Sequence, residues 1–462
     1  MQDMTVTVAD MMAARDARAQ MQRRLLARHE GACVVCLCMN IAGPVKSTPA
    51  IEKAFAWGAN AVRAVLAPHA LCFEGEIHEK TGPEAMFCVQ ADAMLLKHRL
   101  CALEDGEAIG RLLDIDVIAS GGEKIARTAL GLPARRCLLC GRDAPACARS
   151  RTHSADDLFK RAHEIIAAHM EADFVRRTAQ AATRALLCEV AVTPKPGLVD
   201  RANAGAHEDM DMFTFIDSAC ALTPYFETCA RAGLRFRGEP ANECFDALRV
   251  PGLLAEADMR SATGGVNTHK GAIFSLGIAC AALGMGHGDA PQRAENVLLR
   301  CGEMTKEQMA REFARMNGGA PRTFGERAFV EQGVGGVRAE AAAGFPSVRD
   351  ISLPRLRACL HAGMSLNDAG LCALAALMAA TQDTNALRRG GEEGARAMRQ
   401  EAQAIHALIT AALESGTAAE QAPSLHKTLH AFDARLCDAH ISPGGCADLL
   451  ALTFLMRFAL NE

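Results

Sequence analysis

The spacing of apolar residues divides the chain into two parts. In the first part, Ala32–Met39 is a compact apolar run of strand length, and Asp114–Ile118 alternates apolar and acidic residues with the period of a strand. A helical pattern near Thr48–Leu66 lies between them. We therefore predict an α/β or α+β domain over residues 1–160, for which a nucleotidyltransferase-like fold is one candidate.

The second part has the periodicity of helices. From about Ser154 onward, apolar residues recur three and four apart in stretches rich in Ala, Leu, Arg and Glu, namely Phe174–Val192, Phe213–Ala232, Ala369–Ala380 and Ala395–Leu413. Runs of β-branched residues are scarce after residue 160, which removes the usual material for a sheet. We predict a larger all-α domain over residues 173–462, with Ala155–Met170 as a connecting helix.

Composition narrows the classes of function. The chain has 462 residues, too many for one ordinary core, and 50 Lys and Arg against 54 Asp and Glu, for a formal net charge of -4. This balance argues against a protein whose main role is to bind nucleic acid. The longest apolar stretch, Ala272–Gly286, is shorter than the ~18 residues of a spanning helix, so we expect no membrane partner. Nineteen cysteines without a visible secretory signal predict mostly free thiols in a reducing cytoplasm.

Two aspartates mark a candidate metal site in the first domain. Asp114 and Asp116 are separated by one residue on a predicted strand, so their side chains point to the same face. Two such carboxylates can hold Mg²⁺, which bridges phosphate oxygens while Arg111 takes up charge on the leaving group. The alternative is a solvated edge strand with two surface aspartates.

Two further features of this domain carry candidate ligands. A Gly-Pro turn follows the first apolar run and places Gly43 and Lys46 at the end of the strand, where α/β folds tend to bind ligands, although an ordinary turn has the same sequence. A CxxC pair with a further cysteine and histidine could close a tetrahedral zinc site, formed by Cys137, Cys140, Cys147 and His153. The spacing is not that of a standard zinc finger, and chance pairs are common in a cysteine-rich chain.

The segment 193–211 is the densest chemical feature of the second domain. It packs carboxylates, one lysine and one histidine between prolines and glycines, a composition typical of sites for phosphates and metal ions. Its candidate residues are Lys195, Asp200, Arg201, His207, Asp209 and Asp211. Asp211 could instead cap the helix that follows. Just upstream, Glu189 is an acid in an apolar helical pattern, and partly buried carboxylates of this kind often have a function.

Three other breaks between helices carry polar residues. A glycine pair and a polar run precede the helical pattern at Ala272, where freed backbone amides, the helix dipole and a lysine can bind an anion; the residues are Gly264, Gly265, Asn267, His269 and Lys270. This order is not that of a Walker A loop, and the alternative is a glycine-rich turn with a polar cap. Asp383 and Ser442 lie in the other two breaks, where capping is the default explanation.

The first domain resembles a known family. The segments Ala42–Lys46, Gly110–Asp116 and Pro133–Cys140 with Cys147–Arg149 resemble the apo-citrate lyase phosphoribosyl-dephospho-CoA transferase family over nearly the whole domain. The resemblance implies that a serine of the citrate lyase acyl carrier protein (gamma chain) attacks the α-phosphate of a triphosphoribosyl donor and that pyrophosphate leaves. Asp114 and Asp116 with Mg²⁺ suit this nucleotidyl transfer.

The second domain resembles another family. The segments Leu187–Arg201, Gly205–Asp211, Ala262–Gly271 and Ser442–Gly445 with Ala447–Leu449 resemble the triphosphoribosyl-dephospho-CoA synthase family across about residues 173–460. The family joins ATP to 3′-dephospho-CoA and releases adenine. The resemblance implies that the dephospho-CoA ribose 2′-hydroxyl attacks C1 of the ATP ribose through a transition state with oxocarbenium character.

Residue roles follow from this resemblance as hypotheses. We assign Mg²⁺ to Asp200, Asp209 and Asp211, with Asp209 also counted as catalytic, and triphosphate oxygens to Lys195, His269 and Lys270. Glu189 is the candidate base or cation stabiliser. Arg201, His207, Asn267, Asp383 and Ser442 are further candidate substrate-binding residues.

Because the product of the second domain is the donor for the first, the sequence predicts a bifunctional cytoplasmic transferase that makes and installs the citrate lyase prosthetic group. The alternatives are a metal-dependent nucleotide or ADP-ribose hydrolase and a non-catalytic zinc-stapled adaptor that binds the acyl carrier protein.

Overall fold

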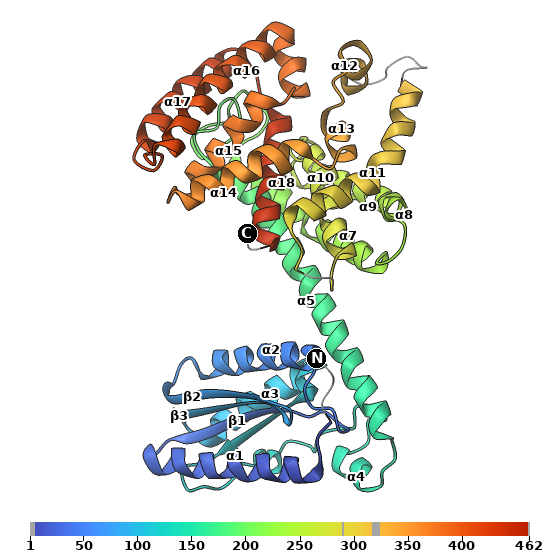
Figure 1. The fold of residues 1–462 in the computed structure, drawn as a ribbon, viewed down its shortest axis with the longest axis vertical. Helices are drawn as coiled ribbons and strands as arrows, with labels where there is room; N and C mark the ends of the chain where they lie inside the picture. Colours follow the sequence, from blue (N-terminus) through green and yellow to red (C-terminus); the bar gives the residue numbers. More distant parts are fainter. Residues whose placement is uncertain (1–4, 289–290, 317–323, 461–462) are drawn as a thin grey trace. The chain divides into compact units, whose positions relative to one another are not determined.

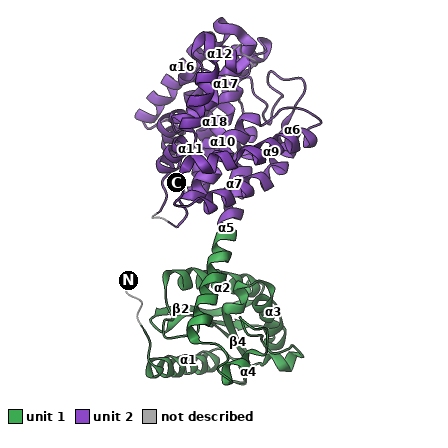
Figure 2. Ribbon diagram, turned by 90° about the vertical axis from the view of Figure 1, so that its right-hand side faces the viewer, with its two compact units in different colours: residues 1–173 green, residues 174–462 purple. Residues whose placement is uncertain are grey.

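The computed structural model describes residues 5–288, 291–316 and 324–460. The chain divides into two compact units, residues 1–173 and 174–462, which are coloured separately in Figure 2. Over the described ranges no helix combines the length and apolarity needed to cross a bilayer.

The first unit is an α+β domain built on a four-stranded sheet. Its elements are α1 (Val8–Arg28), β1 (Cys33–Met39), α2 (Pro49–Leu66), β2 (Ala70–Glu79), β3 (Gly82–Gln90), α3 (Ala93–Gly106), η1 (Ile109–Leu112), β4 (Leu113–Ile118), η2 (Arg127–Leu130) and α4 (Ala144–Arg149). The strand order is β2-β3-β1-β4, and every neighbouring pair is antiparallel. The two predicted strands and the helix after Thr48 are confirmed.

Helices cover both faces of this sheet (Figure 1). On one face, Phe55 of α2 and Leu100 of α3 pack against alternate strand residues that include Val35 and Ile115. On the opposite face, Leu25 of α1 packs with Val34, Cys36 and Ile118. Since side chains alternate along a strand, this register places Asp114 and Asp116 on the face that α1 covers.

The second unit is helical throughout its described part. Its helices are α5 (Ala155–Ala191), which begins in the first unit, α6 (Met212–Ala221), α7 (Thr223–Arg235), α8 (Ala241–Ala247), α9 (Arg249–Ala262), α10 (Lys270–Met285), α11 (Ala294–Met316), α12 (Phe324–Gln332), α13 (Gly336–Ala342), the π-helix η3 (Ser347–Ser352), α14 (Leu353–His361), α15 (Leu366–Ala380), α16 (Thr384–Glu414), α17 (Ala422–Asp438) and α18 (Gly444–Leu460).

Two predicted helix boundaries were wrong. Ala155–Met170 and Phe174–Val192 are one continuous helix of 37 residues, because no proline or glycine interrupts α5. The predicted helix Phe213–Ala232 is instead two helices that meet at Leu222. Pro224 lies in the first turn of α7, where its missing N–H costs nothing, and it starts a new helix there.

The core of the second unit forms around α10. This helix packs against α7, α11 and α18, and nearly every residue from Ala272 to Gly284 is buried. A helix that is apolar on all sides is buried on all sides, which explains the uniform sequence of this stretch. The N-terminus of α10 is polar, and the candidate site of the second unit lies there.

Candidate functional site

A cavity of about 430 Å³ lies at the N-terminus of α10. Its walls come from the end of α5, the loop after it, the start of α16 and the start of α18. It brings together eight of the predicted residues, namely Glu189, Lys195, His207, Asp209, Asn267, His269, Lys270 and Ser442. Predicted residues up to 253 positions apart in the sequence, Glu189 and Ser442, therefore line one cavity.

A buried ion pair forms the floor of this cavity. The Lys195 ammonium donates to Glu189 Oε1, and the two residues are 1% and 3% exposed. Burial raises the pKa of Glu189, while the adjacent ammonium acts in the opposite direction. The pair satisfies both charges, since either one alone would be costly to bury.

Asp448 is another acidic group of this cavity, close to Glu189. Burial raises its pKa well above the ordinary aspartate value, and the nearby Glu189 carboxylate raises it further. Asp448 accepts a hydrogen bond from the backbone of Ala272 in the first turn of α10. A Cβ at position 271 would overlap Asp448 Oδ2, so Gly271 makes room for this carboxyl group. Two neighbouring acids thus have different environments, one beside a cation and one without.

His269 presents a free ring nitrogen. The Thr268 hydroxyl donates to Ser218 Oγ at 2.8 Å, and Ser218 Oγ lies 2.7 Å from His269 Nδ1. With Ser218 as donor to Nδ1, the proton of the neutral ring is on Nε2. Burial lowers the pKa of His269 to about 3, so the ring is neutral. Its Nε2 is buried and has no hydrogen-bond partner within the described ranges, which leaves one donor for a ligand.

His207 connects two other walls of the cavity. Arg389 Nη2 donates to His207 Nδ1 at 3.1 Å, and His207 Nε2 therefore donates to Ser442 Oγ at 2.9 Å. Burial and the Arg389 charge lower the pKa of His207 to about 4. Arg389 also donates to the Ala206 carbonyl at 2.9 Å. This series of hydrogen bonds holds the loop after α5 against the starts of α16 and α18.

Six predicted residues are absent from the cavity lining over the described part of the chain: Asp200, Arg201, Asp211, Gly264, Gly265 and Asp383. Asp200 is buried and accepts backbone N–H groups of Lys195, Ala202 and Asn203 at 2.8, 2.6 and 3.1 Å. Its carboxylate therefore shapes the loop that carries Lys195. Arg201 donates to Asn367 Oδ1 at 3.0 Å.

The remaining acids of this group are helix caps. Asp211 accepts from the Thr214 N–H at 2.9 Å at the start of α6, the alternative that the sequence left open. Asp383 caps α16 and also accepts the Cys446 N–H of α18 at 2.8 Å. Both side chains satisfy backbone donors at helix N-termini.

The glycine pair also belongs to another helix end. Gly264 and Gly265 have φ values of 64° and 98°, and the Gly265 N–H donates to the Arg260 carbonyl at 2.7 Å. They terminate α9, because a left-handed conformation after the last turn satisfies its free carbonyls. Four residues lie between Gly265 and Lys270. The predicted role of the pair at the N-terminus of α10 is therefore not supported.

The predicted magnesium ligands do not converge. Across residues 5–288, 291–316 and 324–460, Asp200, Asp209 and Asp211 form no group of ligands close enough to share an ion. Asp209 alone lines the cavity, with a side chain 65% exposed. Lys270, which also lines the cavity, forms an ion pair with Glu256 at 3.0 Å.

A second, more apolar cavity of about 400 Å³ adjoins the first. The two share Lys270, Gly271 and Val337 in their linings. Its own walls combine aromatic and aliphatic side chains with a few charged ones, and include Tyr225, Phe245, Leu253, Phe274, Arg249 and Arg338. A polar cavity and an apolar cavity thus meet at the first turn of α10.

In the first unit, Asp114 and Asp116 share the α1 face of β4. They lie opposite Cys38 and Cys36 of β1. Asp116 forms an ion pair with Lys124 at 2.6 Å, and Asp114 lies 3.9 Å from Arg135. The same face carries a third acid, since Glu84 of β3 lies opposite Cys38 and pairs with Arg18 of α1.

Side chains of α3 and of the loop after η2 form hydrogen bonds with the backbone at the free edge of β4. The Lys97 ammonium donates to the Ile115 carbonyl, and Glu104 accepts the Ile115 N–H at 3.0 Å. Arg135 donates to the Leu113 carbonyl at 2.7 Å. An edge strand otherwise leaves such groups unpaired, so these contacts fix the backbone that carries both aspartates.

A third cavity, of about 740 Å³, lies beside the start of β4. Its lining contains four arginines, namely Arg111, Arg135, Arg136 and Arg151, and three of the predicted zinc ligands. Arg111 Nη2 donates to the carbonyls of Arg136 and Cys137 at 2.8 and 3.1 Å. Lys46 donates instead to the Ile41 carbonyl, and Gly43, with φ 81°, serves the same turn, so both have local structural roles.

Several residues of the two candidate sites were not predicted from the sequence. Asp448 stands in the motif after Ser442 but was not singled out, and Arg388 and Arg389 follow Asp383 without a spacing that marks them. Glu84 and Arg18 carry no motif. Only the strand register brings Glu84 to the face of Asp114, so no local pattern could reveal it.

Comparison with known proteins covers both units. Residues 175–461 match the family model of ATP:dephospho-CoA triphosphoribosyl transferase, and residues 6–169 match that of apo-citrate lyase phosphoribosyl-dephospho-CoA transferase. Protein CitXG of Leuconostoc mesenteroides subsp. cremoris is 33% identical over 96% of this chain and 95% of that protein. Protein CitXG of Haemophilus influenzae is 32% identical over 99% of this chain and 97% of that protein.

A single-function relative matches the second unit. A probable 2-(5''-triphosphoribosyl)-3'-dephosphocoenzyme-A synthase of Vibrio cholerae is 40% identical over 60% of this chain and 85% of that protein. None of these three relatives is described as a hydrolase or an adaptor. The chain therefore belongs to the ATP:dephospho-CoA triphosphoribosyl transferase family and carries at its N-terminus a domain of the apo-citrate lyase phosphoribosyl-dephospho-CoA transferase family.

Proposed function

We propose that this chain is a bifunctional transferase of citrate lyase prosthetic-group biosynthesis. Its second unit joins ATP to 3′-dephospho-CoA and releases adenine. Its first unit transfers the phosphoribosyl-dephospho-CoA group to a serine of the citrate lyase acyl carrier protein and releases pyrophosphate. The observation that carries the proposal is the single cavity that joins the motifs around Lys195, His207, His269 and Ser442 in a chain similar over its full length to CitXG proteins. Its nineteen free thiols support a cytoplasmic setting.

The two neighbouring acids suit the two proton transfers of the synthase step. As the dephospho-CoA 2′-oxygen bonds to C1 of the ATP ribose, the bond from C1 to N9 breaks and its electron pair leaves with adenine. Glu189, whose carboxyl group accepts from the Lys195 ammonium, stabilises the oxocarbenium charge and accepts the hydroxyl proton. Asp448, whose pKa burial raises, donates a proton to the departing adenine.

Basic and polar groups around these acids suit the triphosphate. Arg388 and Arg389 line the cavity with Lys270, and the Nε2–H of His269 is free to donate to a phosphate oxygen. Mg²⁺ usually keeps several waters and binds through one or two carboxylates plus phosphates, so the exposed Asp209 fits as its protein ligand. When bound, Mg²⁺ would neutralise the triphosphate.

The apolar cavity that adjoins the polar cavity suits dephospho-CoA, the second substrate. Dephospho-CoA carries an adenine ring and a long pantetheine arm, and both favour aromatic and aliphatic walls. The two cavities meet at Gly271, next to Asp448. If dephospho-CoA occupies the apolar cavity that Phe274 lines, its ribose 2′-hydroxyl would reach the ATP ribose beside Glu189 and Asp448.

In the first unit, Asp114 and Asp116 suit Mg²⁺ for the transfer to the carrier serine. Both carboxylates lie on one face of β4, and Glu84 adds a third acid to that face. When bound, the ion would neutralise negative charge on the phosphates of the donor. The arginines near the start of β4 suit the negative charges of the triphosphate and of the leaving pyrophosphate.

The two activities can be tested separately and then together. Adenine release from ATP and dephospho-CoA measures the second unit, and mass spectrometry of apo-carrier protein with the same substrates and Mg²⁺ measures both. We expect Asp448→Asn to abolish both signals and Asp114→Asn to abolish only the mass gain. Asp246→Asn, at an exposed position of α8, is the matched control.

Three outcomes would contradict the proposal. The first is adenine release that does not depend on dephospho-CoA, which would indicate hydrolysis. The second is a carrier mass gain without ATP. The third is near-normal adenine release by Asp448→Asn, which would contradict the part of the proposal that assigns the general acid to Asp448.

A further inference from the structure

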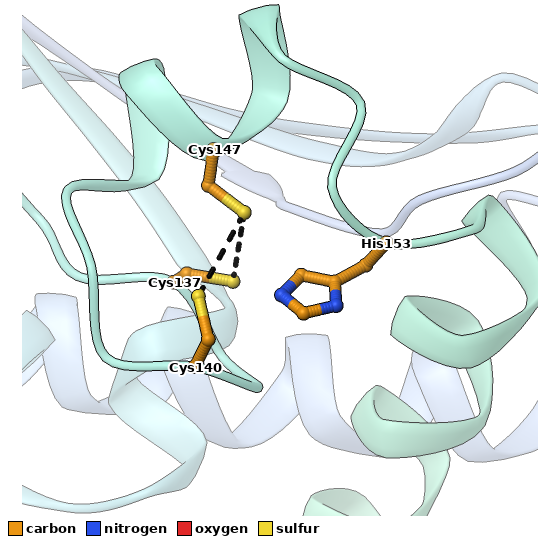
Figure 3. Close-up of side chains that lie close together, drawn as sticks. All are labelled: Cys137, Cys140, Cys147 and His153. Carbon is orange, nitrogen blue, oxygen red and sulfur yellow. Dashed lines mark hydrogen bonds between the residues drawn. The ribbon is translucent and has the colours of Figure 1, made fainter.

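Four side chains of the first unit lie close together without forming part of the proposed chemistry. Sγ of Cys137, Sγ of Cys140, Sγ of Cys147 and a ring nitrogen of His153 all lie within 4.8 Å of one another (Figure 3). Over the described ranges this is the only group of three or more His, Cys, Asp or Glu side chains with such spacing.

The sulfur spacing matches a tetrahedral metal centre. Sγ of Cys147 lies 3.5 Å from Sγ of Cys137 and 3.9 Å from Sγ of Cys140. Zn–S bonds of about 2.3 Å in a tetrahedron place two sulfurs roughly 3.8 Å apart. A disulfide needs an S–S distance of about 2.05 Å, and all three cysteines are free.

The backbone arranges the CxxC pair. The Cys137 N–H donates to the Arg142 carbonyl at 2.7 Å, and Arg136 pairs with Asp143 in an isolated bridge, so the segment forms a short hairpin. Gly141 has φ 69°, a left-handed conformation that glycine adopts without strain. The resulting turn brings both cysteines to one side.

His153 supplies an independent observation. Its Nε2 atom is buried and has no hydrogen-bond partner in the part of the chain that the structure describes. Figure 3 shows the imidazole directed toward the three sulfurs. A buried, unsatisfied ring nitrogen is costly, and a metal ion at the centre of the four groups would satisfy it.

We infer that Cys137, Cys140, Cys147 and His153 bind one structural Zn²⁺ ion. Thiolate and imidazole ligands favour zinc over the Mg²⁺ of the transfer reactions. Four protein ligands fill a tetrahedral shell and leave no position for a substrate, which is the arrangement of structural sites.

The ion has a positioning role for the transferase unit, and this part rests on the proposed function. Arg111 donates to the carbonyls of Arg136 and Cys137, and Arg135 donates back to the carbonyls of Arg111 and Leu113 at 2.9 and 2.7 Å. The loop that carries Cys137 and Cys140 is therefore hydrogen-bonded to Leu113, the first residue of β4, next to Asp114. It also forms one wall of the arginine-lined cavity.

The metal content of the full chain tests the site directly. Purified protein, incubated with zinc chloride and then freed of loose metal, should hold about one zinc per chain by plasma mass spectrometry. Cobalt chloride added to the zinc-free chain should give thiolate-to-cobalt charge-transfer bands and the intense visible bands of a tetrahedral ion. Neither readout depends on either enzyme activity.

Variants define the ligands. We expect Cys147→Ala and His153→Ala to lose the zinc, His153→Cys to keep it with four thiolates, and Cys220→Ala, which removes an exposed cysteine of the second unit, to leave it unchanged. Because Leu138 packs in one cluster with Trp57, tryptophan fluorescence should show a lower unfolding midpoint for the zinc-free first unit. Adenine release by the second unit should not change.

The inference is overturned if the zinc-treated full chain holds far less than one zinc, if it binds an iron–sulfur cluster instead, or if Cys147→Ala and His153→Ala both retain zinc. If the chain binds zinc through these ligands but fails to modify the carrier protein, the proposed function is contradicted and the inferred metal site is not.

Discussion

The buried pair of Glu189 and Lys195 permits a quantitative prediction. In Lys195→Met the lysine charge is removed while Glu189, 3% exposed, keeps its carboxyl group in the core. Breaking one side of a buried ion pair costs about 3–5 kcal/mol, because the remaining charge is uncompensated. Lys270→Met is the matched control, since Lys270 forms an exposed pair with Glu256 that is worth about 0–1 kcal/mol.

The pH dependence has a defined sign. Burial raises the pKa of Glu189 above its ordinary value of 4.5, and the loss of Lys195 raises it further. A carboxyl group with a raised pKa in the folded state stabilises that state fully below its unfolded pKa and loses this contribution as the pH rises. The defect of Lys195→Met should therefore be larger at pH 8 than near pH 5.

Urea denaturation followed by far-UV circular dichroism measures the effect in the helical second unit. With an m value of about 3 kcal/mol/M, the loss corresponds to a midpoint shift of about 1–1.7 M. Trp57 fluorescence reports on the first unit and should not shift. The double variant Glu189→Leu with Lys195→Met should recover most of the stability, because apolar replacement of a buried pair is often neutral, but it should not release adenine.

Two results would refute this reasoning. The first is a Lys195→Met defect no larger than that of Lys270→Met. The second is a defect that grows as the pH falls.

Three further predictions concern catalysis by the second unit. Gly271→Ala should lower adenine release on the order of 100-fold with little loss of fold, because the added methyl group displaces Asp448; a near-normal rate would exclude a role for that carboxyl group. His269→Ala should lower kcat/KM roughly 10- to 100-fold through one lost hydrogen bond to phosphate. Since the pKa of His269 is lowered to about 3, the wild-type pH–rate profile should show no histidine ionisation from this residue between about pH 5 and 8, and a step that His269→Gln removes would contradict the assignment. Leu253→Asp should raise the KM for dephospho-CoA roughly tenfold and leave the KM for ATP unchanged in steady-state assays, because Leu253 lines only the apolar cavity; equal effects on both would place the two substrates differently.

Local patterns predicted most of the fold. The alternation at Asp114–Ile118 and the apolar run at Ala32–Met39 became β4 and β1, and the pattern after Thr48 became α2 with Thr48 as its cap. Errors arose where one residue decides a boundary, as at Pro224 between α6 and α7. Strand order was beyond reach, because pairing depends on partners distant in the sequence.

The site was predicted less completely than the fold. Residues with an acidic side chain beside a helix start, such as Asp211 and Asp383, have the same local sequence whether they cap the helix or bind a ligand. Asp200 likewise turned inward to three backbone donors. Burial and hydrogen-bond partners distinguish these possibilities, and neither can be read from one segment.

The sequence by itself determined the two-part architecture, the family and the segments that carry polar chemistry, because periodicity and motif spacing are local properties of the chain. Only the tertiary structure decided which of those polar groups face a common cavity. It joined Glu189 to Lys195 and Asp448 at the N-terminus of α10, and it brought the four candidate zinc ligands to one point. The physical reason is that a buried charge must find its partner in space, and the packing of helices from distant parts of the chain supplies that partner.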